Sequence, residues 1–113
     1  MYINNKSCPW GQKAFTNYLG STEAGKDHDA TLLLLNQKAN TTFDDILIDQ
    51  GSDDQFLHSK QLLPNAFVNA AKECGGNQKI TYNERDGFDH SYYFIAAFIR
   101  DHIEFHAQRL NKV

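Results

Sequence analysis

Three consecutive aliphatic residues, Ile46, Leu47 and Ile48, constrain the fold of this chain more than any other feature of its sequence. Neighbouring side chains of a strand point to opposite faces, so such a run indicates a strand that is buried on both sides, as in the middle of a parallel sheet. Apolar residues at helical spacing follow over 62–73, and a second strand pattern follows over 79–83. A strand, a helix and a strand in this order predict a parallel pair joined by a right-handed crossover.

The other expected elements are helical, and the segment 21–27 is expected to be a loop. The longest helix, 91–110, is apolar nearly all round over 92–99, which predicts deep burial of that half. Two strands cannot cover their own edges, so the chain is expected to belong to a larger sheet whose other strands lie outside it. The predicted fold is α/β, with parallel strands near 45–49 and 79–83 and helices near 12–19, 30–38, 62–73 and 91–110.

Length and charge limit the classes of function. The 113 residues suit one domain, and 11 basic against 14 acidic residues give a net charge of −3. Without a basic run, neither nucleic acid nor an anionic membrane surface is an expected partner. No apolar run reaches membrane-spanning length, and the first residues do not form a signal peptide. Two cysteines make no disulfide framework, so we expect a cytoplasmic protein.

Two polar loops follow the predicted strands directly. The first, 51–56, contains Asp54, and the second, 86–90, ends in His90. Ligands of open α/β sheets bind beyond the carboxyl ends of the strands, where both loops lie. An acid after one strand and a histidine after the next match the trailing part of a Ser…Asp…His order. A solvated acidic turn and an ordinary loop histidine explain the same spacing, and the pattern alone does not decide between them.

Five segments of the sequence together resemble the S-formylglutathione hydrolase family, also called the esterase D family. The resemblance runs from Cys8 to Asn111 without a break. The segments that carry it are Cys8–Gly20, Ile46–Leu57, Gln61–Pro64, Gly87–Phe94 and Asp101–Ala107.

The resemblance implies an α/β-hydrolase that cleaves the thioester S-formylglutathione to formate and glutathione, without a metal or another cofactor. Asp54 then corresponds to the acid of the catalytic triad, with Asp53 as the neighbour that could be confused with it, and His90 corresponds to the catalytic histidine. Trp10 and the aromatic residues Phe56 and Tyr93 would line the substrate pocket, although plain packing explains each of them as well.

The sequence departs from the family in one large respect. The family's nucleophile lies in a Gly-x-Ser-x-Gly turn, and none of the five serines of this chain is so flanked. The oxyanion-hole segment is also missing. Residues 1–113 therefore match the C-terminal portion of a single hydrolase domain, which is expected to be inactive alone. We expect it to pair with the complementary N-terminal portion or with a second copy of itself. The alternative is a non-catalytic fragment or interaction module that retains the hydrolase framework.

The last predicted helix carries two histidines at a spacing that metal sites use. His102 and His106 lie four residues apart, a spacing that can bind zinc. The HExxH arrangement is absent, and cationic residues are favourable near any helix C-terminus. No metal site is predicted there.

Overall fold

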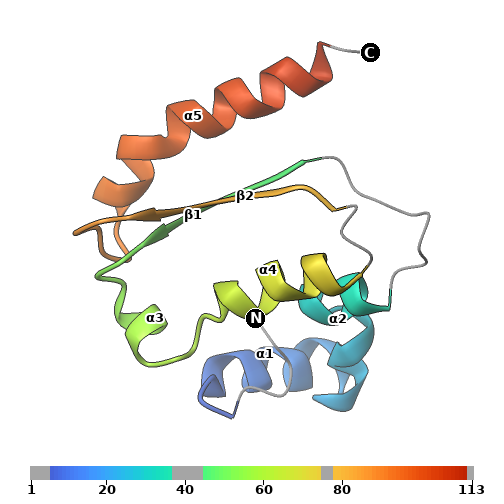
Figure 1. Ribbon diagram of the computed structural model, residues 1–113. Helices are drawn as coiled ribbons and strands as arrows, with labels where there is room; N and C mark the ends of the chain where they lie inside the picture. The colour runs from blue at the N-terminus through green and yellow to red at the C-terminus, as the bar shows by residue number, and fades with distance from the viewer. Residues whose placement is uncertain (1–5, 37–44, 75–77, 112–113) are drawn as a thin grey trace.

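Two parallel strands with helices on both faces make up the computed structural model, which describes residues 6–36, 45–74 and 78–111. In Figure 1, α5 lies on one face of the sheet and α4 on the other, with α2 and α1 beyond α4. The elements in chain order are α1 (Pro9–Leu19), η1 (Glu23–Asp27, a 3-10 helix), α2 (Ala30–Leu35), β1 (Ile46–Gly51), α3 (Gln55–His58), α4 (Pro64–Glu73), β2 (Ile80–Arg85) and α5 (Tyr92–Leu110).

The sheet confirms the predicted strand–helix–strand unit. β1 pairs with β2 in parallel, with the register running from Ile46 opposite Ile80 to Gly51 opposite Arg85. Both strands continue past their predicted C-terminal ends, to Gly51 and Arg85. Backbone pairing continues there through polar residues, which an apolar pattern does not reveal. The carboxyl ends of β1 and β2 therefore lie side by side, as the argument for a shared site requires.

The buried core is small and lies between α2, α4 and β2. Leu34, Ala70 and Ala71 are buried, and Phe67 and Ile80 pack against them. The aliphatic run of β1 is only half-buried, in contrast to the burial expected on both faces. The described residues contain no third strand, so each strand has one neighbour and one open edge.

The helix boundaries differ from prediction where local capping decides them. α1 begins at Pro9 rather than near residue 12, because proline is well suited to the first helical position. The expected loop over 21–27 contains the 3-10 helix η1, so that expectation was wrong. α2 is capped by Asp29 and ends at Leu35, and positions 37–38 of its predicted range lie outside the described residues.

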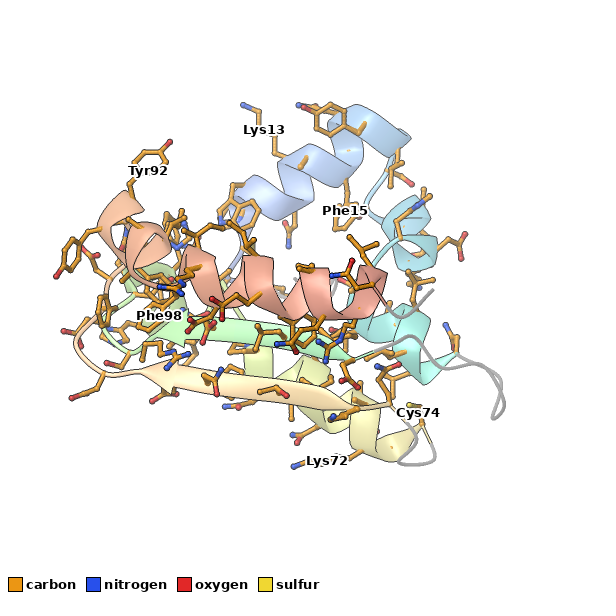
Figure 2. All side chains as sticks on the ribbon, turned by 90° about the horizontal axis from the view of Figure 1, so that it is seen from above. Lys13, Phe15, Lys72, Cys74, Tyr92 and Phe98 are labelled. Atoms are coloured by element: carbon orange, nitrogen blue, oxygen red, sulfur yellow. The ribbon has the colours of Figure 1, made fainter. Side chains whose placement is uncertain are left out.

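Deep burial of the first half of α5 was also predicted, and this is wrong. No described residue of α5 is fully buried, and Tyr92 is 88% exposed. Figure 2 shows Tyr92 pointing away from the body of the molecule. A two-stranded sheet contacts one side of the helix, where Phe94 and Phe98 are half-buried. No helix in the described part of the chain is both long and apolar enough to cross a membrane.

Polar contacts join α5 to the sheet. Near its C-terminal end, Arg109 pairs with Asp45, the residue before β1, and Lys79 lies 3.2 Å from the same carboxylate. Two turns earlier, His102 Nε2 lies 2.7 Å from Asp49 Oδ2 within β1. The hydrogen bonds from Arg109 and Lys79 lower the pKa of Asp45. Burial opposes ionisation of Asp49, but hydrogen bonds, led by the one from Arg85, outweigh it and lower its pKa too.

We predict that acid weakens the folded chain in part through these two carboxylates. Folding lowers their pKa, so their contribution is complete above the unfolded value of about 3.9 and is lost as pH falls through the lower folded values. The free energy of unfolding, measured with urea and circular dichroism from pH 6 downwards, should fall below about pH 4. Asp49→Asn should flatten this dependence, whereas Asp86→Asn, in an exposed loop, should not. A stability that stays constant or rises in acid would contradict the account.

The end of β1 is docked against the loop that follows β2. The amide of Ser52 donates to Arg85 O at 3.0 Å, and the amide of Asp53 donates to Phe88 O at 2.9 Å. A Cβ added to Gly51 would lie 2.2 Å from the carbonyl oxygen of Phe88. This approach is open only to glycine and sets the position of the loop that carries His90.

Gly51→Ala should therefore push the 86–90 loop away from β1. The cost should be about 1–3 kcal/mol of stability, as for other overpacked positions, with amide shifts concentrated in that loop. Gly20→Ala is the matched control. A Cβ added there would meet no atom within 4 Å, so the variant tests the backbone strain of a positive φ of 85° without a steric clash. Amide spectra and urea unfolding of the two variants test this. An unperturbed 86–90 loop in Gly51→Ala would show that the contact does not position it.

Candidate active site

The carboxylate of Asp54 is the most heavily hydrogen-bonded acid of the described structure. It caps α3, where Oδ1 accepts from the amides of Phe56 at 2.7 Å and Leu57 at 3.3 Å. Aspartate is a favoured N-cap residue for this reason. Oδ2 accepts from Gln50 Nε2 at 3.0 Å and faces His90 Nδ1 at 2.8 Å. The side chain is 3% exposed, so it is fixed by its neighbours rather than by water.

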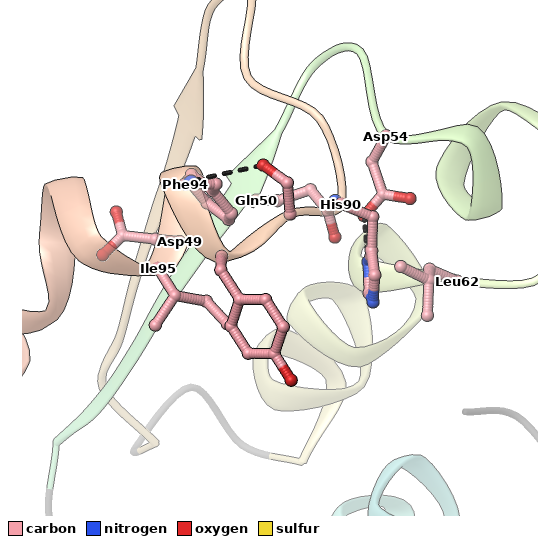
Figure 3. A pocket seen from close by; sticks show the side chains of 9 residues that line it. Asp49, Gln50, Asp54, Leu62, His90, Phe94 and Ile95 are labelled. Carbon is pink, nitrogen blue, oxygen red and sulfur yellow. Dashed lines mark hydrogen bonds and ion pairs between the residues drawn. The ribbon is translucent and has the colours of Figure 1, made fainter.

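His90 lies on the loop between β2 and α5, directly before the helix cap Ser91. Its ring packs edge-on against Phe56, with the centroids 4.8 Å apart. A carboxylate at Nδ1 favours the tautomer in which Nδ1 carries the proton and Nε2 keeps its lone pair. About half of the side chain, 55%, is exposed, so Nε2 is accessible to a reacting group. Figure 3 shows the contact between the His90 ring and Asp54.

The structure separates the two neighbouring aspartates. Asp53 is exposed, and its side chain interacts with Ser52 Oγ at 3.4 Å. Asp54 is the one that contacts His90, as the resemblance implied. The catalytic roles of Asp54 and His90 stay predictions, because contact alone does not test them.

A pocket of about 440 Å³ opens beside this pair. The end of β1 contributes to its wall, together with the loop between β2 and α5, the first turn of α5 and the segment between α3 and α4. Figure 3 shows the side chains around it. The lining residues are Asp49, Gln50, Asp54, Leu62, His90, Ser91, Tyr92, Phe94 and Ile95.

The three aromatic residues suggested for substrate binding lie in different places. Phe56 contacts the His90 ring and so lies at the site. Trp10 donates from Nε1 to Gln61 Oε1 at 2.6 Å and does not line the pocket. Tyr93 stacks on Phe88, with the centroids 5.8 Å apart, and is 75% exposed outside the lining. Substrate contact by any of the three stays a prediction.

Sequence reasoning missed Gln50 and Asp49. Gln50 is buried and donates to Asp54, and Asp49 lines the pocket and pairs with His102. The available signal was a pair of polar residues at the end of an apolar strand, directly before the acidic turn. The predicted strand ended between them, so neither was assigned to the site.

The histidines of α5 are engaged in other ways than zinc binding. His102 contacts Asp49, and His106 packs against Phe105 with the ring centroids 5.2 Å apart. Within residues 6–36, 45–74 and 78–111, no group of three or more His, Cys, Asp or Glu side chains has an arrangement suited to a metal ion.

The electrostatics of the Asp54–His90 pair suit proton transfer. Burial disfavours the charged carboxylate, but hydrogen bonds from His90, Gln50 and the two α3 amides outweigh it and hold the pKa of Asp54 below its usual value. A carboxylate that stays ionised can orient the imidazole and stabilise its protonated form. The pair can therefore act as a general base towards a nucleophile placed at Nε2.

Comparison with known proteins gives the same family as the sequence motifs. The chain is 51% identical over 108 residues to S-formylglutathione hydrolase of Arabidopsis thaliana and 49% identical over 105 residues to that of Rattus norvegicus. The fold matches a solved S-formylglutathione hydrolase from Agrobacterium tumefaciens with a TM-score of 0.77 and 37% identity. These matches cover 95%, 92% and 92% of this chain, respectively.

The same matches cover only 36% of each relative, so this chain spans about a third of their length. The likeness to the Agrobacterium enzyme confirms the α/β fold class expected from the sequence. A family described as "Putative esterase" matches residues 1–105. The match takes in both strands and both residues of the Asp54–His90 pair, and the chain belongs to this esterase family.

Proposed function

We propose that this chain supplies the acid and the base of a serine hydrolase that acts on S-formylglutathione or a similar small ester. The observation that carries the proposal is the 2.8 Å contact between buried Asp54 and His90 beside the pocket. The relatives named S-formylglutathione hydrolase support the substrate class. The proposed setting is the cytoplasm, and the proposed role is formaldehyde detoxification.

The nucleophile is proposed to come from the portion of the hydrolase that this chain does not span. A serine hydroxyl attacks the thioester carbonyl while His90 Nε2 takes its proton. The carbon–sulfur bond breaks, the formyl group stays on the serine, and the imidazolium returns the proton to the leaving glutathione thiolate. Water, deprotonated by His90, then releases formate and restores the serine. Asp54 holds the ring in place through both steps.

An exposed apolar side of α5 supports the need for a complementary portion. Isolated exposed apolar residues are ordinary, but five on one side of a helix form a surface that a larger domain would cover. We propose that residues 1–113 are the C-terminal portion of one hydrolase domain and that its remainder packs here. The exposed side chains are Tyr92, Ile95, Ile99, Ile103 and Leu110.

The chain alone should not hydrolyse S-formylglutathione or an aryl ester above background. It has no Gly-x-Ser-x-Gly nucleophile, and oxyanion donors contribute about 10²–10³-fold in rate per donor in other hydrolases. Purified chain and its His90→Ala variant, assayed side by side, give the test. Turnover that disappears in His90→Ala would contradict this prediction and point to a nucleophile within the chain, with Ser91 in the pocket lining as the first candidate.

The assignment of the acid can be tested in a fusion of this chain to the portion of the Arabidopsis relative that it does not span. Asp54→Asn should lower kcat by about 10⁴-fold, as the same change does in a serine protease, because the imidazole loses its orienting carboxylate. Asp53→Asn is the matched control and should cost far less, because an exposed turn residue contributes little. The opposite ranking of the two variants would show that Asp53 is the acid.

A further inference from the structure

A second carboxylate–imidazole pair, Asp49 with His102, lies beside the proposed site. Asp49 directly precedes Gln50, which donates to Asp54. Asp49 Oδ2 is 2.7 Å from His102 Nε2, and Asp49 Oδ1 accepts from Arg85 Nε at 2.7 Å. The Asp49 side chain is 4% exposed, so its charge depends on these partners and on a hydrogen bond from Asn83 of β2. We call one set of residues the Asp49 network: Asp49 of β1, Arg85 of β2 and His102 of α5.

This network is placed where it can fix α5 on the sheet. The helix has no fully buried residue, and its half-buried Phe94 and Phe98 rings pack with Phe88 of the preceding loop, so the polar contacts add to a limited apolar one. The Arg85 guanidinium also lies over the Phe98 ring, 4.2 Å from its centroid, which adds a cation–π contact to the same face of α5. The network and Phe98 together place charged and aromatic contacts on the side of α5 that faces the sheet.

The position of α5 determines where His90 lies. Ser91 caps the helix, and its Oγ accepts from the amide of Phe94, so His90 is joined to the first turn without a flexible linker. His102 is about 16 Å further along the axis at 1.5 Å per residue. Asp49 also precedes Gln50, which donates to Asp54. One carboxylate–histidine pair therefore joins β1 to α5, and the other joins the turn directly after β1 to the loop directly before α5.

We propose that the Asp49 network is a positioning group that holds His90 Nδ1 within hydrogen-bond reach of Asp54. This role rests on the function proposed above for His90. A helix free to slide or rotate would carry His90 away from Asp54, because the pair is made across two separate elements. Arg109 and Asp45 hold the far end of α5, and nearer to the site the Asp49 network is joined by an ion pair between Arg85 Nη2 and Asp101 Oδ2 at 3.8 Å.

The test observes the His90 ring directly in the 113-residue chain. Long-range ¹H–¹⁵N spectra at neutral pH report which ring nitrogen carries the proton, and a His90→Gln variant assigns the signal among the five histidines. In the unchanged chain, we expect the proton on Nδ1, which faces Asp54. In His102→Leu, we expect His90 to shift towards the Nε2-protonated tautomer that a free imidazole prefers.

Two variants control for indirect effects. His102→Gln keeps a donor near the Nε2 position and should restore the Nδ1-protonated tautomer of His90. His106→Leu makes the same substitution one turn along the same helix, on an exposed side chain, and should leave His90 unchanged. The measurement reports which nitrogen of the His90 ring carries the proton, and it does not use turnover. Its result therefore does not depend on whether the proposed substrate is correct.

The outcomes decide the proposal in each case. A folded His102→Leu chain with an unchanged His90 tautomer overturns it, as does an equal shift in His106→Leu. If His102→Leu does not fold, Asp49→Asn replaces it, since the amide keeps the size of the side chain and one acceptor oxygen. A shift in Asp49→Asn supports the proposal, and no shift overturns it. If both variants unfold, the network holds the whole fold and the positioning role is wrong.

Discussion

The buried carboxylate of Asp54 is the interaction on which the arrangement of this site depends. It caps α3 through two backbone amides and receives Gln50 from β1 and His90 from the loop before α5. Burying a charged carboxylate is unfavourable unless hydrogen bonds satisfy its oxygens. The hydrogen bonds from these partners therefore keep Asp54 ionised, and the ionised carboxylate in turn holds the partners in place. The same group thus fixes the end of β1, the start of α3 and the orientation of the imidazole. Gly51 allows the close backbone approach that brings the two loops together.

Charged contacts, rather than a large core, hold α5 against the sheet. The cluster of buried apolar side chains lies on the opposite face, around Leu34 and Ala71. On the α5 side, Asp45 and Asp49 of the β1 segment face Arg109 and His102 of the helix. The outer side of α5 is apolar and exposed, which agrees with a chain that spans about 36% of the length of its hydrolase relatives.

Periodicity and motif order predicted most of this architecture, because strand and helix patterns are local properties of the sequence. The parallel pair, its crossover helix and the placement of Asp54 and His90 after the strands needed no further information. Burial of α5 was predicted wrongly because an apolar pattern reports what a helix can bury and not which neighbours are present. Helix α3 was missed because four residues are too few to show a helical pattern. The roles of Asp49 and Gln50 were missed because their contacts with His102 and with the Asp54 side chain depend on the three-dimensional arrangement.

The central claim is that His90 acts as the base of a hydrolase site completed by another portion of the domain. The most direct measurement is S-formylglutathione hydrolysis by this chain co-expressed, as a separate polypeptide, with the complementary portion of the Arabidopsis relative. The account predicts turnover that requires both polypeptides and disappears when His90 is replaced by alanine. Turnover by the reassembled pair that survives His90→Ala would contradict it.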